Sequence, residues 1–306
     1  IFKLLMIYPN FFDSRNTYNL FGLKNFFFLL FSLYNNKKLP KVLMLSGEKG
    51  SGKSTLINHF LYSVFDDKNY NIDNCTLLEN SSFHKQFKSD IFPNIIYLKG
   101  SDFNTIKIED IRVLKSKISQ SSIVDKNRFI ILDDVELFNN NSLNALLKII
   151  EEPNKNDYFI LVYNKSKPLL ETINSRSIEI KILLTENQRL NITNDLINIF
   201  DIDLALDLEK SQLSPGNFLK FNHICNEYKI SIFDSFIDNL SILLGLYKKN
   251  KDILFIKLVY FIVDSYFKNL YEKNIYKTDE IYEVKKFIYD SLNNFLIYNI
   301  NQNSLI

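Results

Sequence analysis

The chain has 306 residues, enough for two or three domains, and its net charge of +2 is too near neutral to indicate nucleic-acid binding by charge alone. Its two cysteines, Cys75 and Cys225, lie far apart and its three histidines form no metal-binding spacing, which favours a reducing, cytoplasmic setting without zinc. The longest apolar run, residues 26–31, falls far short of the roughly 20 residues that cross a membrane. We therefore expect a globular chain with no membrane contact.

The first predicted elements surround a phosphate-binding loop. Apolar positions predict a helix over residues 18–35, a strand over residues 42–45 and a second helix over residues 55–64. Between this strand and the second helix, the sequence matches G-x-x-x-x-G-K-[ST] at every fixed position. The matching residues are Gly47, Glu48, Lys49, Gly50, Ser51, Gly52, Lys53 and Ser54, followed by Thr55.

This pattern has a specific chemistry. Its glycines let backbone N–H groups turn towards phosphate oxygens, and the helix that follows presents its N-terminus to the same anion. Lys53 offers a positive charge to the β and γ phosphates, and the Ser54 hydroxyl is suited to bind Mg²⁺. We therefore expect ATP with Mg²⁺ at Gly47 to Thr55, and the alternative is a chance match.

Two carboxylates follow the next buried strand. Residues 66–100 look irregular apart from a strand candidate at 95–98, and a helix is predicted over residues 109–119. The apolar run 129–132 then ends at Asp133 and Asp134, which places both at the ligand-binding edge of an open α/β sheet. Asp133 is a candidate for the aspartate that holds Mg²⁺ on the nucleotide, and the alternative is that it caps the following turn. Asp134 is a candidate for orienting the attacking water, although many P-loop ATPases place the longer Glu here.

A helix and another strand complete the predicted sheet. A helix is expected over residues 142–152, with Asn141 or Ser142 as its cap and Pro153 as its stop. The strand 157–163 ends at Asn164, whose side chain would either sense a γ-phosphate or cap a turn. Residues 178–182 alternate as a half-buried strand does. The fold class is therefore α/β with a parallel sheet.

The remainder of the chain reads as helical. Residues 186–201 predict one amphipathic helix, and Ser214-Pro215-Gly216 is a clear break. Residues 217–300 predict several helices whose aromatic stripes belong to a core. The chain would therefore consist of a P-loop domain followed by a helical half.

Two blocks carry a resemblance to a known family. The first is Leu143-Asn144-Ala145-Leu146-Leu147-Lys148 with Glu151-Glu152-Pro153, and the second is Thr172-Ile173-Asn174-Ser175-Arg176. The P-loop precedes both blocks. Together these features make residues 14–182 resemble bacterial clamp-loader proteins of the AAA+ class, most closely the delta-prime family of DNA polymerase III. The rest of the chain fits by class alone.

The resemblance implies a domain plan and partners. It implies an AAA+ nucleotide-binding domain at 14–182, a helical lid at 183–222 and a helical collar at 223–306 that holds subunits in a ring; residues 1–13 would be an extension of uncertain role. The implied partners are the tau or gamma and delta subunits, the sliding clamp, and primed DNA through the complex. Arg176 would be an arginine finger that reaches the ATP of a neighbouring subunit, or, alternatively, a surface salt bridge.

Several departures favour a companion subunit over the ATPase motor of the same loader. That motor usually carries Asp-Glu where this chain has Asp133-Asp134, and Cys where Ser177 stands. The break at residues 214–217 offers no lid arginine, and residues 66–100 lack the four-cysteine zinc module. We therefore expect ATP binding with weak or absent turnover and no zinc. A tau-type motor and a structural subunit with an idle P-loop remain as alternatives.

Overall fold

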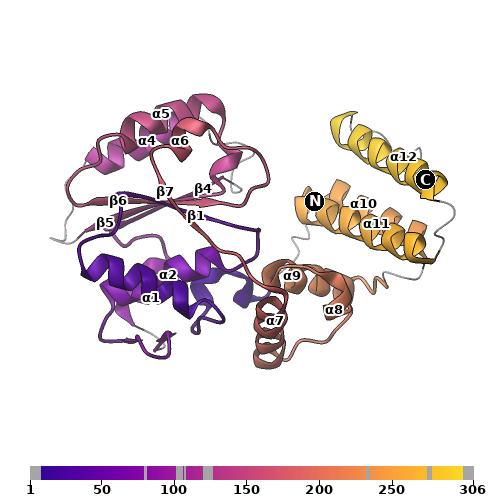
Figure 1. Cartoon of the computed structure of the whole chain (residues 1–306), viewed down its shortest axis with the longest axis horizontal. Helices are drawn as coiled ribbons and strands as arrows, with labels where there is room; N and C mark the ends of the chain where they lie inside the picture. The colour runs from indigo at the N-terminus through magenta and orange to yellow at the C-terminus, as the bar shows by residue number, and fades with distance from the viewer. Residues whose placement is uncertain are drawn as a thin grey trace. The chain divides into compact units, whose positions relative to one another are not determined.

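The computed structural model describes residues 8–78, 81–100, 106, 108–119, 127–231, 235–273 and 278–298, which belong to two compact units (Figure 1). The sheet unit comprises residues 10–199 and 214–217. The helical unit comprises residues 1–9, 200–213 and 218–306. The predicted division into AAA+ domain, lid and collar stays a prediction.

A five-stranded parallel sheet, in the order β4-β5-β6-β1-β7, forms the centre of the sheet unit (Figure 1). Every residue of β1 and β5 is buried, as expected for parallel strands that are covered on both faces. The strands are β1 Val42–Ser46, β4 Ile95–Lys99, β5 Arg128–Asp133, β6 Asp157–Tyr163 and β7 Ile178–Lys181.

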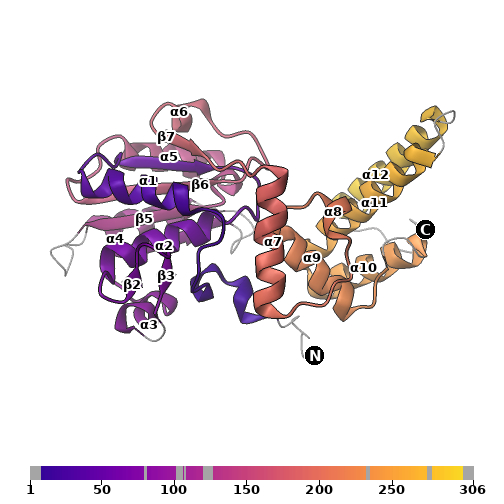
Figure 2. The ribbon, with the colours of Figure 1, turned by 60° about the horizontal axis from the view of Figure 1, so that its bottom comes forward.

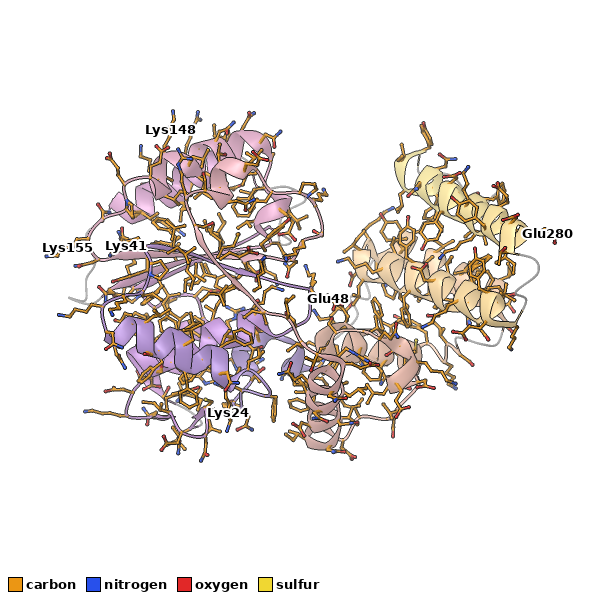
Figure 3. The ribbon with its side chains drawn as sticks, viewed as in Figure 1. Lys24, Lys41, Glu48, Lys148, Lys155 and Glu280 are labelled. Carbon is orange, nitrogen blue, oxygen red and sulfur yellow. The ribbon has the colours of Figure 1, made fainter. Side chains whose placement is uncertain are left out.

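Helices cover both faces of this sheet. α1 Lys24–Asn35 and α2 Lys53–Phe65 lie on one face, and α4 Ile108–Ser119, α5 Asn140–Ile150 and α6 Glu171–Asn174 lie on the other (Figure 1). Alternate strand residues feed two separate cores: Leu43 and Leu45 join the α1–α2 side, while Val42 and Met44 join the α4–α5 side. Lys24 on α1 and Lys148 on α5 point away from the sheet, as amphipathic helices require (Figure 3).

The predicted strands and the main helices are confirmed, but two helix starts were wrong. The helix expected over 18–35 begins at Lys24; the preceding residues form the short 3₁₀ helices η1 Asn10–Phe12 and η2 Ser14–Asn16, and Asn19 bridges to Thr76. α5 is capped by Asn139, whose side chain accepts from the Ser142 N–H, rather than by Asn141 or Ser142. Extended Asn139 supplies the cap that α5 needs, so the helix starts before its first apolar residue.

The expectation of an irregular segment over 66–100 was also partly wrong. It contains an antiparallel pair, β2 Tyr70–Asn71 with β3 Thr76–Leu77, and the helix α3 Ser82–Lys88, all of which contact α2 (Figure 2). Stacked and edge-on aromatic rings hold this segment together, and each pair adds to simple burial. These rings belong to Tyr62, Phe65, Phe83, Phe87 and Phe92.

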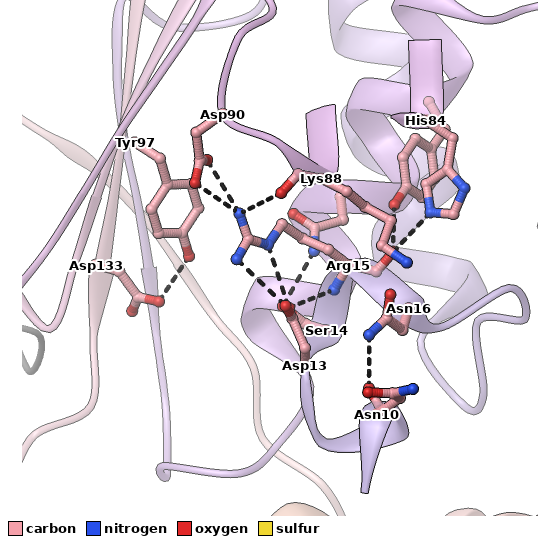
Figure 4. Close-up of polar contacts among 12 residues, drawn as sticks. Asn10, Asp13, Ser14, Arg15, Asn16, His84, Lys88, Asp90, Tyr97 and Asp133 are labelled. Atoms are coloured by element: carbon pink, nitrogen blue, oxygen red, sulfur yellow. Dashed lines mark hydrogen bonds and ion pairs between the residues drawn. The ribbon is translucent and has the colours of Figure 1, made fainter. Parts of the chain in front are cut away.

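Polar groups tie the N-terminal segment to this aromatic core. The backbone carbonyl of Arg15 accepts hydrogen bonds from the Tyr62 hydroxyl (3.1 Å) and from His84 Nε2 (2.9 Å). The guanidinium of the Arg15 side chain pairs with Asp13 and Asp90 (Figure 4). His59, fully buried, lies 3.1 Å through Nε2 from the carbonyl of Thr17 and 3.0 Å through Nδ1 from the hydroxyl of Tyr70. Because a carbonyl only accepts, Nε2 carries the proton and Nδ1 accepts from Tyr70.

Over its described residues the helical unit contains helices and loops but no strand, which confirms the prediction that this half is helical. Its long helices are α10 Phe236–Asn250, α11 Ile253–Lys273 and α12 Thr278–Tyr298, and α10 packs along α11. α7 Glu186–Phe200 and α9 Pro215–Glu227 each include residues of both units, and α8 is Leu208–Ser211. Within the described part of the chain, none of the helices has the length and apolar character that a bilayer crossing requires.

The buried His59 predicts a pH dependence of stability. Burial lowers its pKa from 6.5 to about 4, so the unfolded chain binds a proton that the folded chain rejects. The free energy of unfolding is therefore highest above pH 6.5 and falls as the pH drops towards 4, because protons then bind the unfolded chain preferentially. Between pH 7 and pH 5 this effect of His59 should lower the free energy of unfolding by about 2 kcal/mol. Urea titrations at both values should show this loss, and His59→Gln should reduce it.

If His59→Gln keeps the full difference between pH 7 and pH 5, the carboxylates of the chain account for it, and the assignment to His59 is wrong.

Candidate functional site

The predicted phosphate-binding loop connects the end of β1 to the first turn of α2. Gly50 and Gly52 have φ values of +87° and +89°, which side chains rarely adopt. A Cβ at Gly47 would lie 2.4 Å from the Ile182 carbonyl oxygen, and one at Gly52 would lie 2.9 Å from Leu23 Cδ1. The loop therefore needs its glycines, and it leads into the N-terminus of a 13-residue helix, where backbone N–H groups attract anions.

Lys53 lies in this loop with its side chain buried. Its Nζ donates to the carbonyls of Gly47 (2.9 Å) and Glu48 (2.6 Å). Burial lowers its pKa to about 8, although the carboxylates of Asp133, Glu136 and Asp134 act in the opposite direction. The loop thus holds an ammonium group next to its own backbone turn, while the side chain of Glu48 is exposed.

The structure brings together the two residues that were predicted to hold Mg²⁺. The Ser54 hydroxyl donates to Asp133 Oδ2 over 3.1 Å. The same oxygen accepts from the Tyr97 hydroxyl at 2.8 Å (Figure 4). Asp133 Oδ1 accepts from the Asp134 N–H at 2.9 Å. Burial, and then the charge of Asp134, raise the pKa of Asp133. A hydroxyl and a carboxylate side by side are oxygen donors that suit Mg²⁺, so this donor set fits the ion.

Asp134 and Asn164 also meet at this edge of the sheet. Asp134 Oδ1 accepts from Lys49 Nζ and from Asn164 Nδ2, each at 2.7 Å. Its backbone is left-handed, with φ of +53°, which Asp tolerates better than most residues. Asn164 therefore faces the carboxylate next to the predicted Mg²⁺ ligand, which is the place that a γ-phosphate sensor requires, and the choice between sensor and turn cap stays a prediction.

Sequence reasoning missed Glu136, which lies in the 3₁₀ turn η4 Val135–Leu137. Its side chain is buried, and Oε1 accepts from the Asn164 N–H (3.2 Å) and from the Ser166 hydroxyl (2.8 Å). Over the described ranges Oε2 has no hydrogen-bond partner. Glu136 thus fixes the backbone that presents the Asn164 side chain. The only signal in the sequence was an acidic residue three positions after Asp133, and the residues that it contacts, Asn164 and Ser166, are distant in sequence.

Residues 214–217, predicted to be a simple break, bind the phosphate-binding loop. The Ser214 hydroxyl (2.6 Å) and Asn217 Nδ2 (3.0 Å) both donate to the Lys49 carbonyl. The Gly216 N–H donates to the Gly50 carbonyl over 2.9 Å. A Cβ at Gly216 would lie 3.0 Å from Gly50 Cα and from the Gly50 carbonyl oxygen, so this approach needs glycine on both sides. The conformation of the loop therefore depends on the start of α9.

Arg176 lies apart from these groups, in the turn that follows α6. Its Nε and Nη2 donate to Glu151 Oε1 at 3.0 and 2.6 Å, and Nη1 donates to the Thr172 carbonyl at 3.1 Å. Its side chain is 36% exposed. Among the described residues, these are the polar contacts of its guanidinium, and none of them involves the phosphate-binding loop. Arg176 therefore does not contact its own chain's loop in this conformation, and its role as an arginine finger stays a prediction.

The described ranges contain no group of three or more His, Cys, Asp or Glu side chains that could hold a metal ion. The expectation that the chain lacks zinc stays a prediction.

Comparison with known proteins identifies relatives of this chain. The family model described as "DNA polymerase III, delta subunit" matches residues 23–185. The DNA polymerase III subunit delta' of Buchnera aphidicola subsp. Schizaphis graminum is 30% identical over 71% of this chain and 68% of that protein. The delta' subunit of Bacillus subtilis is 27% identical over 48% of this chain and 44% of that protein. The gamma subunit of Buchnera aphidicola subsp. Acyrthosiphon pisum is 25% identical over 48% of this chain and 39% of that protein.

Among solved structures, a gamma subunit-related protein of DNA polymerase III from Thermotoga maritima aligns with 90% of this chain and 95% of its own, at 15% identity and a TM-score of 0.48. The matches to the Bacillus and Acyrthosiphon-symbiont proteins span less than half of those proteins. The family match nevertheless contains the phosphate-binding loop, both aspartates and Arg176. The chain therefore belongs to the DNA polymerase III delta-subunit family, as a delta-prime-like clamp-loader subunit.

Proposed function

We propose that this chain binds ATP and contributes Arg176 to the ATPase site of a neighbouring subunit in a clamp loader. Its partners would be tau or gamma and delta subunits, and the assembly would place a sliding clamp on primed DNA during replication. One observation carries the proposal: a complete phosphate-binding loop stands beside Asp134, whose Oδ1 already accepts from Lys49 and Asn164. Such a site suits binding better than turnover.

The groups of the loop support ATP as the ligand. The N–H groups of the loop and the first turn of α2 would bind the phosphates, and Lys53 would add its charge to the β and γ phosphates. Ser54 and Asp133, already 3.1 Å apart, would hold Mg²⁺, which would neutralise phosphate charge. Asn164 would lie near the γ-phosphate end because its amide contacts Asp134.

Weak or absent turnover follows from the surroundings of Asp134. A water-orienting carboxylate must accept a hydrogen bond from the attacking water, and Asp has a shorter reach than Glu. Lys49 and Asn164 both donate to Oδ1, so a water would compete with a cation and an amide for that oxygen. Asp134 therefore acts as a structural anchor between the loop and β6.

Arg176 supports a role in the active site of another subunit. Its guanidinium is partly exposed and anchored on α5 and α6, on the opposite face of the sheet from α2 (Figure 1). An arginine finger stabilises the charge that develops on a transferring phosphoryl group and raises the rate by about 10³ to 10⁵ where it has been measured. As a surface salt bridge it would add at most about 1 kcal/mol.

The proposed setting is the cytoplasm, where replication complexes act, with no membrane partner and no zinc. Contact with DNA would occur through the assembled complex, because the net charge of +2 provides little attraction for nucleic acid.

One observation favours a motor subunit of the tau type as the second candidate function. Asn164 contacts Asp134 over 2.7 Å, as a sensor and a water-orienting acid would. Under that alternative, the isolated chain hydrolyses ATP steadily and Asp134→Asn abolishes the activity.

The two lysines of the loop provide a matched test of ATP binding. Lys53→Met should weaken ATP–Mg²⁺ binding by roughly 10- to 100-fold, because it removes charge-assisted hydrogen bonds to phosphate. Lys49→Met should change affinity by less than about threefold, because Lys49 pairs with Asp134 instead. Calorimetric titration with ATP–Mg²⁺ measures both effects. Equal weakening by both variants would contradict these roles, and no binding by the native chain would indicate an idle loop.

Replacement of Arg176 tests its action on a neighbour. In a loader assembled from this chain and the partner subunits of its own organism, Arg176→Ala should abolish ATP hydrolysis stimulated by clamp and primed DNA, because the neighbouring site loses its finger. Lys148→Ala, which removes a positive charge that points outward from α5, should leave the rate unchanged (Figure 3). Gel filtration checks assembly, and an unchanged rate with Arg176→Ala would eliminate the finger.

A further inference from the structure

The guanidinium of Arg176 is held at three of its five N–H donors. Nε and Nη2 both bond Glu151 Oε1, at 3.0 and 2.6 Å, and Nη1 bonds the Thr172 carbonyl at 3.1 Å. Arginine presents its donors in a rigid planar fork, so these three bonds fix the plane and the direction of the group. One N–H on each terminal nitrogen remains, and such a pair suits bidentate contact with a phosphoryl group.

Glu151 itself stands on a rigid support. It is the C-cap of α5, and its N–H donates to the Leu147 carbonyl over 3.0 Å. α5 and α6 pack together through one apolar cluster that includes Ile150 and Ile173, which are 2% and 0% exposed. The carboxylate at the end of α5 and the arginine after α6 are therefore carried by two helices that pack into the same apolar cluster.

Helix stability does not explain an acid at this position. The C-terminal end of a helix carries partial negative charge, so it favours Lys, Arg or His over Glu. The side chains of Glu151 and Arg176 are 46% and 36% exposed, and exposed ion pairs contribute little to folding. The main effect of the ion pair between Glu151 and Arg176 is therefore on the orientation of the Arg176 side chain.

We propose that Glu151 is a positioning residue that preorganises Arg176 for the phosphoryl oxygens of a nucleoside triphosphate bound to a neighbouring subunit. This inference rests on the proposed function of Arg176 as a finger. A free arginine side chain loses much rotational freedom when it binds phosphate, and Glu151 removes that loss before the phosphate arrives. Because Glu151 takes the Nε edge, the phosphate does not have to displace it.

Opposite predictions separate positioning from autoinhibition. If Glu151 sequestered Arg176 by competing with phosphate, its removal would raise the rate of the neighbouring site. If Glu151 positions Arg176, its removal lowers kcat and leaves the KM for ATP nearly unchanged, because a finger acts in the transition state.

The experiment uses the assembled loader with clamp, primed DNA and ATP–Mg²⁺. Glu151→Ala should lower kcat by roughly 10- to 100-fold, as misplaced catalytic groups do. Glu151→Gln, which keeps an acceptor oxygen, should give an intermediate rate. The matched control is Glu152→Ala, which removes the adjacent exposed acid and should leave kcat unchanged.

A double variant excludes a general structural role. Because Glu151 acts through Arg176, adding Glu151→Ala to Arg176→Ala should cause no further loss of kcat. An additional loss of the residual rate in the double variant, or an unchanged or higher kcat in Glu151→Ala alone, would overturn the inference while Arg176→Ala has lost only the stimulated rate. If Arg176→Ala is itself fully active, the proposed finger function fails instead.

Discussion

The register between β5 and β6 is the constraint on which the site depends. Arg128 pairs with Asp157 at the first position of this parallel ladder, and their side chains form a buried ion pair through Nε and Nη2, each at 2.8 Å. Breaking such a pair leaves an uncompensated buried charge, which costs about 3–5 kcal/mol. A slip by one residue would break this pair and turn every side chain of β5 to the opposite face. The buried pair thus fixes where β5 ends, and with it the place of Asp133.

At that edge of the sheet, the two aspartates after β5 contact polar groups from neighbouring elements. Asp133 meets Ser54 from α2, and Asp134 meets both Lys49 from the loop and Asn164 from the end of β6. Asp133 and Asp134 are buried, and their charges are tolerated there because each has a donor or an opposite charge within hydrogen-bond distance. The same compensation restricts chemistry, since Asp134 Oδ1 already accepts two hydrogen bonds and so has less capacity to orient a water. The site therefore combines the backbone conformation of a phosphate-binding loop with an acid whose Oδ1 already has two donors.

Much of this fold could be predicted because its signals are local. The apolar runs of β1, β5 and β6 and the spacing of the phosphate-binding loop each lie within a short window of sequence. Tyr97 and Glu136 could not be found in that way. Tyr97 reaches Asp133 because β4 pairs with β5, and Glu136 reaches Asn164 because η4 lies beside the end of β6. Such contacts depend on tertiary pairing, which no local pattern encodes.

The segment between α2 and β4 was missed for a related reason. Its strands β2 and β3 are two residues each, too short for periodicity to detect, and its order comes from aromatic rings that pack on α2. His59 and His84 looked like isolated histidines in the sequence, yet each bonds a backbone carbonyl of the N-terminal segment. The same packing explains why the first long helix begins at Lys24, since residues 14–17 are engaged with α2 and α3 instead.

The most direct measurement is the steady-state rate of ATP hydrolysis by the isolated chain at saturating ATP–Mg²⁺, with bound nucleotide quantified in the same samples. A chain that binds ATP and completes a neighbour's site should hold nucleotide and release phosphate no faster than the buffer control. Steady turnover by the isolated chain, abolished by Lys53→Met, would contradict this account and make the chain a motor in its own right.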